Sequence, residues 1–128
     1  MVAGIAAREL MTRFGRLQPH QVHAKTSAFD LVTQADEAAE AAITAGLLAA
    51  FPEASVLGEE AAARQPSLLE TWSHAELAFV VDPLDGTKNF ASGLPLFGVM
   101  VAVVVHAQVV GAVTVSYTHL TLPTKRIV

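Results

Sequence analysis

Two valine-rich stretches lie in the last third of the chain. They cover residues 97–105 and 109–115, and His106, Ala107 and Gln108 separate them. Valine is branched at Cβ and favours strands, so two such runs with a short interruption are typical of a hairpin in a largely buried sheet. The apolar segment that contains them, residues 94–115, is interrupted by Pro95, His106, Gln108 and two glycines, which argues against a membrane span. The sequence therefore predicts a buried sheet and no membrane partner.

Composition limits the classes of partner and compartment. The chain has 128 residues, of which 52% are apolar, and this suffices for one folded core. The formal net charge is −4 and no basic run is present, so a nucleic-acid partner is not expected. The lack of cysteine excludes disulfides and thiol chemistry. Charged residues break the apolar stretches of residues 1–17, unlike a signal peptide, and we expect a cytoplasmic protein.

Two helices are expected before the sheet. Residues 3–14 place apolar side chains at helical spacing as far as Gly15. A second helix is expected from Thr33, which forms a capping-box pattern with Asp36, and its apolar repeat ends at Pro52. Residues 17–29 are polar and favour a loop or an irregular edge segment.

Acidic residues follow two short apolar runs directly. Residues 55–57 and 78–81 are predicted to be strands; the first runs into Gly58-Glu59-Glu60 and the second into Asp82-Pro83-Leu84-Asp85-Gly86-Thr87. Two strands would thus deliver carboxylates at their carboxyl ends. A shared site is one reading of this pattern.

The residues from Asp82 to Thr87 suit a metal and phosphate site. Pro83 fixes its own φ and Gly86 permits a turn, so that two carboxylates can face one point. Such carboxylates repel each other unless a cation such as Mg²⁺ neutralises them. Thr87 and the Leu84 carbonyl add oxygens, and the amides of Gly86 and Thr87 could face a phosphate. The carboxylate pair alone favours an acidic surface turn, whereas the full string favours the site.

Other candidate residues have structural alternatives. Glu59 and Glu60 fit a solvated helix face, or a site in which one binds metal and the other orients water. Asp36 is, from the residues alone, better explained as a helix cap than as an activator of water. Lys25 is either a solvated cation or a point charge near a phosphate. The five histidines show no metal-ligand spacing: His20, His23, His74, His106 and His119.

The string from Asp82 to Phe90 resembles the signature of the inositol monophosphatase superfamily, which is Asp-Pro-hydrophobic-Asp-Gly-Thr followed closely by Asn and an aromatic residue. Lys25 before residues 30–33, then Asp36, then Gly58-Glu59-Glu60 precede it in the family's order. Together these features cover most of residues 1–115. The resemblance implies the α+β class, with a layered α/β sandwich of the sugar-phosphatase type. This chain would be its amino-terminal half, containing two helices and a largely antiparallel sheet.

The resemblance also implies roles for individual residues. The metal ligands for Mg²⁺ would be Glu59, Asp82, the Leu84 carbonyl and Asp85. The catalytic residues would be Asp36, Glu60 and Thr87, and Asp36 could serve as a cap as well. Gly86 and Thr87 would receive the phosphate, and Lys25 and Lys88 are further candidates.

The implied activity is Mg²⁺-dependent hydrolysis of a small phosphate monoester, inositol monophosphate first, by in-line attack of activated water without a covalent phosphoenzyme. Lys88 stands where inositol-type enzymes often carry a small hydroxyl residue. Nucleotide bisphosphates, fructose bisphosphate and histidinol phosphate therefore remain alternative substrates. The partner would be a small phosphorylated metabolite.

Family members are substantially longer than this chain, and their second half supplies a further metal-binding aspartate. Residues 1–115 are therefore expected to be the amino-terminal metal- and phosphate-binding part, which alone would be inactive. Residues 116–128 do not resemble the family and are expected to be a non-native tail. The alternative is a catalytically silent module that binds metal or forms a homodimer.

Overall fold

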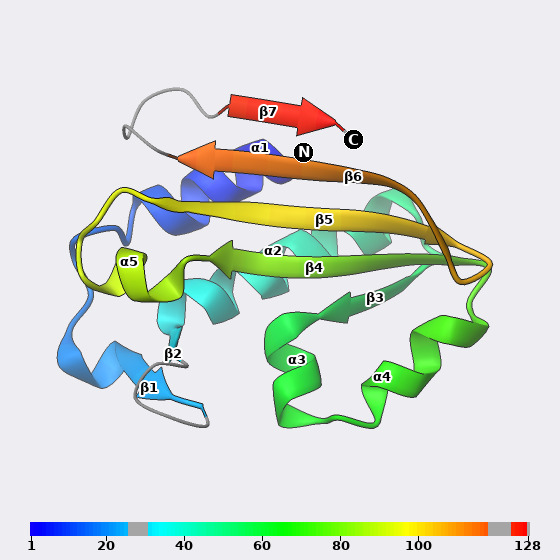
Figure 1. Cartoon of the computed structure of the whole chain (residues 1–128), viewed down its shortest axis with the longest axis horizontal. Helices are drawn as coiled ribbons and strands as arrows, with labels where there is room; N and C mark the ends of the chain where they lie inside the picture. The colour runs from blue at the N-terminus through cyan, green and yellow to red at the C-terminus, as the bar shows by residue number, and fades with distance from the viewer. Residues whose placement is uncertain (26–30, 118–123, 128) are drawn as a thin grey trace.

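The computed structural model describes residues 1–25, 31–117 and 124–127. A five-stranded sheet with the order β3-β4-β5-β6-β7 lies at its centre (Figure 1). The strand bounds are Ser55–Gly58 (β3), Leu77–Asp85 (β4), Phe97–Val105 (β5), Gln108–Tyr117 (β6) and Thr124–Ile127 (β7). β3 and β4 are parallel and the other neighbours are antiparallel. The predicted α+β class with a largely antiparallel sheet is confirmed.

The valine-rich hairpin forms as predicted from β5 and β6. Val105 pairs with Gln108, and the two residues between them, His106 and Ala107, have φ values of 47° and 63°. Two consecutive residues with positive φ are typical of the tight turns that connect twisted antiparallel strands. β6 continues past Val115 to Tyr117, which is buried, so the predicted boundary at residue 115 does not coincide with a break in the sheet. Residues 118–123 and 128 lie outside the described residues.

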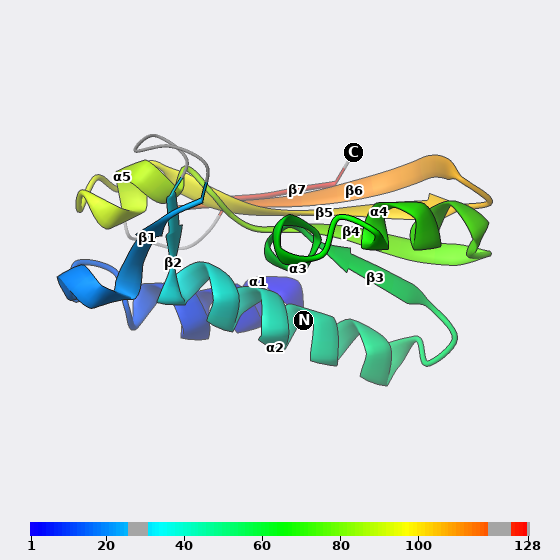
Figure 2. The same ribbon diagram turned by 90° about the horizontal axis from the view of Figure 1, so that it is seen from below.

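The second predicted helix is α2, Gln34–Ala50, which begins with a complete capping box. The Thr33 hydroxyl oxygen accepts hydrogen bonds from the amides of Ala35 and Asp36, and the Asp36 carboxylate accepts one from the Thr33 amide. α2 runs along one face of the sheet (Figure 2), and its buried side chains, among them Ile43 and Leu47, belong to the hydrophobic core. The local pattern therefore predicted the start of α2 and its buried face as far as Leu47. Ala50 and Phe51, which continue the apolar repeat to Pro52, are exposed instead.

The first helix is shorter than predicted. It consists of α1, Val2–Ala6, and a π-helical turn, Ala7–Met11, and it ends before Phe14. Phe14 has helical spacing but lies beyond the helix, where its ring contacts Phe90 and Phe97 with centroid distances of 5.5 and 5.1 Å. Phe14 therefore packs in the core from a position after the helix.

The polar segment after the first helix contains a 3₁₀ turn, Pro19–Gln21, and a short strand, β1 (Val22–Ala24). β1 pairs antiparallel with β2 (Leu31–Thr33), which leads into α2. The expected irregular edge segment is therefore partly a two-stranded sheet. Residues 26–29, the end of the predicted loop, are outside the described residues, and so is Asp30.

Short helices complete the fold. α3 (Glu59–Arg64), α4 (Leu68–Thr71) and a 3₁₀ turn (Trp72–His74) lie beyond the edge strand β3, and α5 (Thr87–Ala91) follows β4 directly (Figures 1 and 2). Most of the sheet face opposite α1 and α2 carries no helix within the described part of the chain. Among the described residues, none of the helices combines the length and the apolar character needed to cross a membrane.

Candidate functional site

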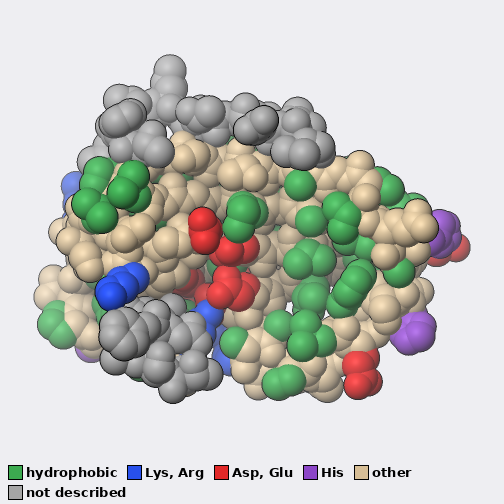
Figure 3. All heavy atoms as spheres, viewed as in Figure 1, with side chains coloured by type: hydrophobic (Ala, Val, Ile, Leu, Met, Phe, Trp, Pro, Cys, Tyr) green, Lys and Arg blue, Asp and Glu red, His purple; other side chains and the backbone are tan. Residues whose placement is uncertain are grey.

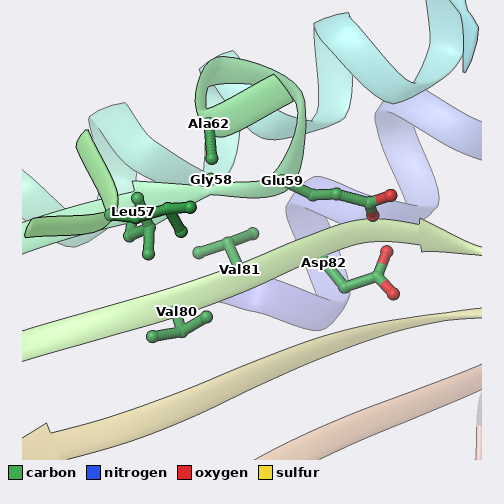
Figure 4. A pocket seen from close by; sticks show the side chains of 8 residues that line it. Leu57, Gly58, Glu59, Ala62, Val80, Val81 and Asp82 are labelled. Atoms are coloured by element: carbon green, nitrogen blue, oxygen red, sulfur yellow. The ribbon is translucent and has the colours of Figure 1, made fainter. Parts of the chain in front are cut away.

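The candidate site lies where the parallel strands β3 and β4 end. Gly58 pairs with Val81, so Glu59 and Asp82, each one residue further along, are brought to the same edge of the sheet. Figure 4 shows their carboxylates side by side and pointing in the same direction. Acidic side chains also gather near the middle of this face in Figure 3. A mostly apolar cavity of about 340 Å³ adjoins the pair and is lined by both residues.

Glu59 and Asp82 form a carboxylate pair whose negative charges would be stabilised by a cation bound between them. Burial, the hydrogen bond with Glu59 and its negative charge raise the pKa of Asp82 to about 7, and the charge of Asp85 acts in the same direction. The Leu84 amide, which donates to Asp82 Oδ1 at 3.2 Å, opposes this shift. Mutually repelling carboxylate oxygens are suitable ligands for a hard divalent cation. The chemistry of these donors therefore fits Mg²⁺.

The third predicted carboxylate ligand is not drawn into this pair. Asp85 is exposed and follows a register shift in β4, and among the described residues no three Asp, Glu or His side chains converge enough to hold an ion. The predicted cluster is thus represented by a pair of carboxylates with Asp85 nearby.

Lys25 joins the two glutamates of α3. Its Nζ lies 3.1 Å from Glu59 Oε1 and 3.0 Å from Glu60 Oε1. Burial alone would lower the pKa of Lys25, but the hydrogen bonds and charges of Glu60 and Glu59 raise it well above its usual value. Burial also raises the pKa of Glu60, which is 3% exposed, to about 7. Sequence reasoning missed these ion pairs because more than thirty residues separate the partners.

Asp36 connects the start of α2 to the segment after β4. Its side chain is 0% exposed; Oδ2 accepts from the Thr33 amide at 2.8 Å, and Oδ1 lies 2.8 Å from Thr87 Oγ1. The Thr87 hydroxyl is also 3.0 Å from the Leu84 carbonyl oxygen. Burial raises the pKa of Asp36 above its ordinary value, although hydrogen bonds from Thr33 and Thr87 counteract this rise. Asp36 therefore both caps α2 and contacts Thr87.

The turn between β4 and α5 requires glycine at position 86. Gly86 has φ of 86°, and a Cβ there would lie 2.7 Å from the Leu96 carbonyl oxygen. The same oxygen accepts a hydrogen bond from Asn89 Nδ2 at 2.8 Å, which ties α5 to the start of β5. Lys88 is exposed on α5, whereas Phe90 is buried beneath it. This turn fixes Thr87 beside Asp36.

Comparison with known proteins identifies the family of this chain. The model of the inositol monophosphatase family matches residues 1–123. The chain belongs to the inositol monophosphatase family. Its members are phosphatases, and the resemblance that we inferred from residues 82–90 is confirmed.

Individual relatives from this family cover nearly the whole chain. A fructose-1,6-bisphosphatase/inositol-1-monophosphatase of Aquifex aeolicus is 36% identical over 121 residues, which are 91% of this chain and 43% of that protein. The crystal structure of the extragenic suppressor protein suhB from Bartonella henselae is 30% identical with a TM-score of 0.74, covering 98% of this chain and 48% of its own. The chain thus spans less than half the length of these relatives.

An IMPase/NADP phosphatase complexed with Mg²⁺ and phosphate has the same fold. Its TM-score is 0.70 at 20% identity, over 92% of this chain and 40% of the other. The inositol monophosphatase family fold is thus present in its amino-terminal portion, as the resemblance implied.

Proposed function

We propose that the chain is the amino-terminal, metal- and phosphate-binding part of a Mg²⁺-dependent phosphatase that hydrolyses a small phosphate monoester, inositol monophosphate first. The observation that carries this proposal is the Glu59–Asp82 carboxylate pair, together with the hydrogen bond between the buried Asp36 and Thr87, which follows β4. These groups come from three separate segments of the chain. A carboxylate pair beside a hydroxyl held by a buried acid suits the hydrolysis of a phosphate ester.

Glu59, Asp82, Asp85 and the Leu84 carbonyl oxygen are the proposed metal ligands. A bound divalent ion would polarise the phosphoryl group and lower the pKa of water. Asp82 and Leu84 belong to β4, so a rigid strand positions both oxygens. The Leu84 carbonyl has a second lone pair besides the one near Thr87 Oγ1, and this lone pair is available to a cation.

Thr87 and Asp36 are proposed to orient the attacking water. A threonine hydroxyl has one proton and two lone pairs. When Thr87 donates its proton to Asp36 Oδ1, at 2.8 Å, its lone pairs can accept a hydrogen bond from water. As the water gives its proton to Thr87 Oγ1, the Thr87 proton can pass to Asp36 Oδ1, so that Asp36 acts as the general base. Glu60 is proposed to assist from the neighbouring α3.

Gly86 and Thr87 are proposed to hold the phosphate through their backbone amides, which lie beside the ligands of β4. Lys25, which already faces the glutamates, and Lys88 are candidates for contacts with the substrate. Inositol monophosphate is proposed first because of the family, and the Aquifex relative's name joins it with fructose bisphosphate. Nucleotide bisphosphates and histidinol phosphate remain alternatives within the same chemistry.

The 128-residue chain alone is proposed to bind metal weakly and to show little activity, because half of the relatives' length is not represented. A catalytically silent, dimerising module is the second candidate. Exposed apolar side chains on the sheet favour it, among them Val109 and Val110, which are 70% and 62% exposed. We further propose a cytoplasmic location, a homodimer, and a non-native tail after residue 115.

A chimeric protein tests the proposed activity. It joins residues 1–115 to the second half of the Aquifex relative, and phosphate release is measured with inositol monophosphate, fructose 1,6-bisphosphate, a nucleotide bisphosphate and histidinol phosphate. We expect Mg²⁺-dependent release from at least one substrate, fastest from inositol monophosphate, and loss of release with EDTA.

The matched control is the same chimera with Asp82→Asn, which should fold equally well by circular dichroism and release phosphate at least about tenfold more slowly. A folded chimera that hydrolyses none of the four substrates in Mg²⁺ would count against the phosphatase proposal. Turnover by the 128-residue chain alone would instead refute the silent module.

A further inference from the structure

Glu40 is a buried carboxylate of α2 that contacts the start of another helix. It lies one turn after Asp36 and is 6% exposed. Its Oε2 accepts a hydrogen bond from the Glu60 amide at 2.6 Å, and its Oε1 accepts one from the Ala61 amide at 2.8 Å. These amides belong to the first turn of α3, whose N–H groups have no acceptor within the helix. Glu40 thus caps α3 from a different helix.

Gly58 provides the space for this carboxylate. It is the residue before α3, with φ of −94° and ψ of 149°, an extended conformation that any L-residue can adopt. Its backbone therefore does not require glycine. A Cβ at this position would instead overlap the carboxylate carbon and oxygens of Glu40. Gly58 has no side chain to cap α3, and Glu40 performs that task through the space that the missing side chain leaves.

The cap holds the backbone next to the candidate metal ligand. Glu59 lies between Gly58 and the two amides that Glu40 clamps, so its Cα is fixed on both sides. Glu60 is itself one of the clamped residues, and Lys25 connects its carboxylate to that of Glu59. α3 has only six residues, so few other interactions can define the direction in which it leaves β3.

We propose that Glu40, with Gly58, is a positioning residue that directs the carboxylate of Glu59 toward Asp82. This inference rests on the proposed function, because it assigns Glu40 a role in divalent-metal binding through Glu59. Residues that orient metal ligands typically change metal affinity 10- to 100-fold when they are replaced. Glu40 does not itself touch the ion.

The test measures Mn²⁺ affinity of the 128-residue chain from the electron paramagnetic resonance signal of free Mn²⁺. Glu40→Gln keeps the shape but turns one oxygen into an N–H donor that faces a backbone N–H. We expect its Mn²⁺ affinity to fall about tenfold or more. The matched control is Glu37→Gln, one turn earlier on α2, which removes an exposed ion pair to Arg64 at the other end of α3 and should leave affinity unchanged.

Gly58→Ala gives an independent test because it disturbs the cap while keeping the Glu40 carboxylate. It should weaken Mn²⁺ binding to a similar extent. In a Glu40→Ala background, where the carboxylate is gone, the same Gly58→Ala change should have little further effect, since coupled residues are not additive. Circular dichroism checks folding, and hydrogen exchange without metal should show faster exchange of the Glu60 and Ala61 amides in Glu40→Gln.

The positioning role alone would be overturned if Glu40→Gln bound Mn²⁺ as tightly as the wild-type chain. It would also be overturned if Gly58→Ala weakened Mn²⁺ binding equally with and without the Glu40 carboxylate. If the wild-type chain bound no Mn²⁺ while its Glu60 and Ala61 amides were protected, the proposed function would fail, and the role of Glu40 in metal binding with it.

Discussion

Asp82→Asn is expected to stabilise the metal-free chain and to abolish its stabilisation by Mg²⁺. In the absence of metal, Asp82 faces the carboxylate of Glu59, and burial and this neighbour raise its pKa to about 7. An asparagine amide can donate a hydrogen bond to Glu59 and carries no charge. Relieving a repulsion between neighbouring carboxylates of this kind is expected to add about 0.5–2 kcal/mol to the free energy of unfolding. Loss of a ligand should remove the response to metal.

Thermal unfolding of both proteins, with Mg²⁺ and with EDTA, measures this prediction. The wild-type midpoint should rise as Mg²⁺ increases, because a ligand that binds only the folded state stabilises it. The Asp82→Asn midpoint should be higher in EDTA and independent of Mg²⁺. The control is Glu53→Gln, which also removes one negative charge but lies on the surface, just before the start of β3 and away from Glu59. It should behave like wild type. A wild-type midpoint that ignores Mg²⁺ would contradict the account.

Phe90→Ala is expected to lower the free energy of unfolding by about 3–5 kcal/mol, because it leaves a large cavity in the core. Phe90 is 1% exposed, and its ring contacts those of Phe14 and Phe97 at centroid distances of 5.5 and 4.9 Å. Phe97 in turn stacks on Tyr117 of β6. This aromatic cluster holds α5 on the sheet, and α5 begins at Thr87. The loss of Phe90 should therefore disturb the turn that positions Thr87.

Urea unfolding of Phe90→Ala and Phe51→Ala compares a buried with an exposed phenylalanine. Phe51 is 40% exposed at the end of α2 and contacts only Phe79 among the ring pairs of the described residues. Its replacement should cost markedly less free energy than that of Phe90. Equal losses for the two variants would mean that the aromatic cluster does not support α5 as described.

Local patterns predicted much of the fold. The valines of residues 97–105 and the Thr33–Asp36 capping box act over a few residues, and both formed as expected. The first helix was predicted too long because Phe14 has helical spacing but uses it to contact β5 and α5. Sequence periodicity cannot distinguish a side chain buried by a helix from one buried just after it.

The candidate site was predictable in composition but not in its internal contacts. Acidic residues after two strands made a shared site plausible, and the parallel pairing of β3 and β4 in the structure brings Glu59 and Asp82 to one edge of the sheet. The ion pairs of Lys25 and the cap formed by Glu40 join residues at least twenty positions apart. No local spacing specifies such contacts, since they depend on how α2 and the residue after β1 lie against α3. Gly58 belongs to the family-like string Gly58-Glu59-Glu60. The structure gives a physical reason for glycine at this position, because a Cβ there would overlap the Glu40 carboxylate.

The most direct test of the central claim is the position of a metal ion in crystals of the chain grown with Mn²⁺ and phosphate. Anomalous diffraction should place manganese within bonding distance of carboxylate oxygens from both Glu59 and Asp82, with Asp85 turned toward it and phosphate beside Thr87. Manganese bound only elsewhere, with Lys25 still bridging Glu59 and Glu60, would contradict the account.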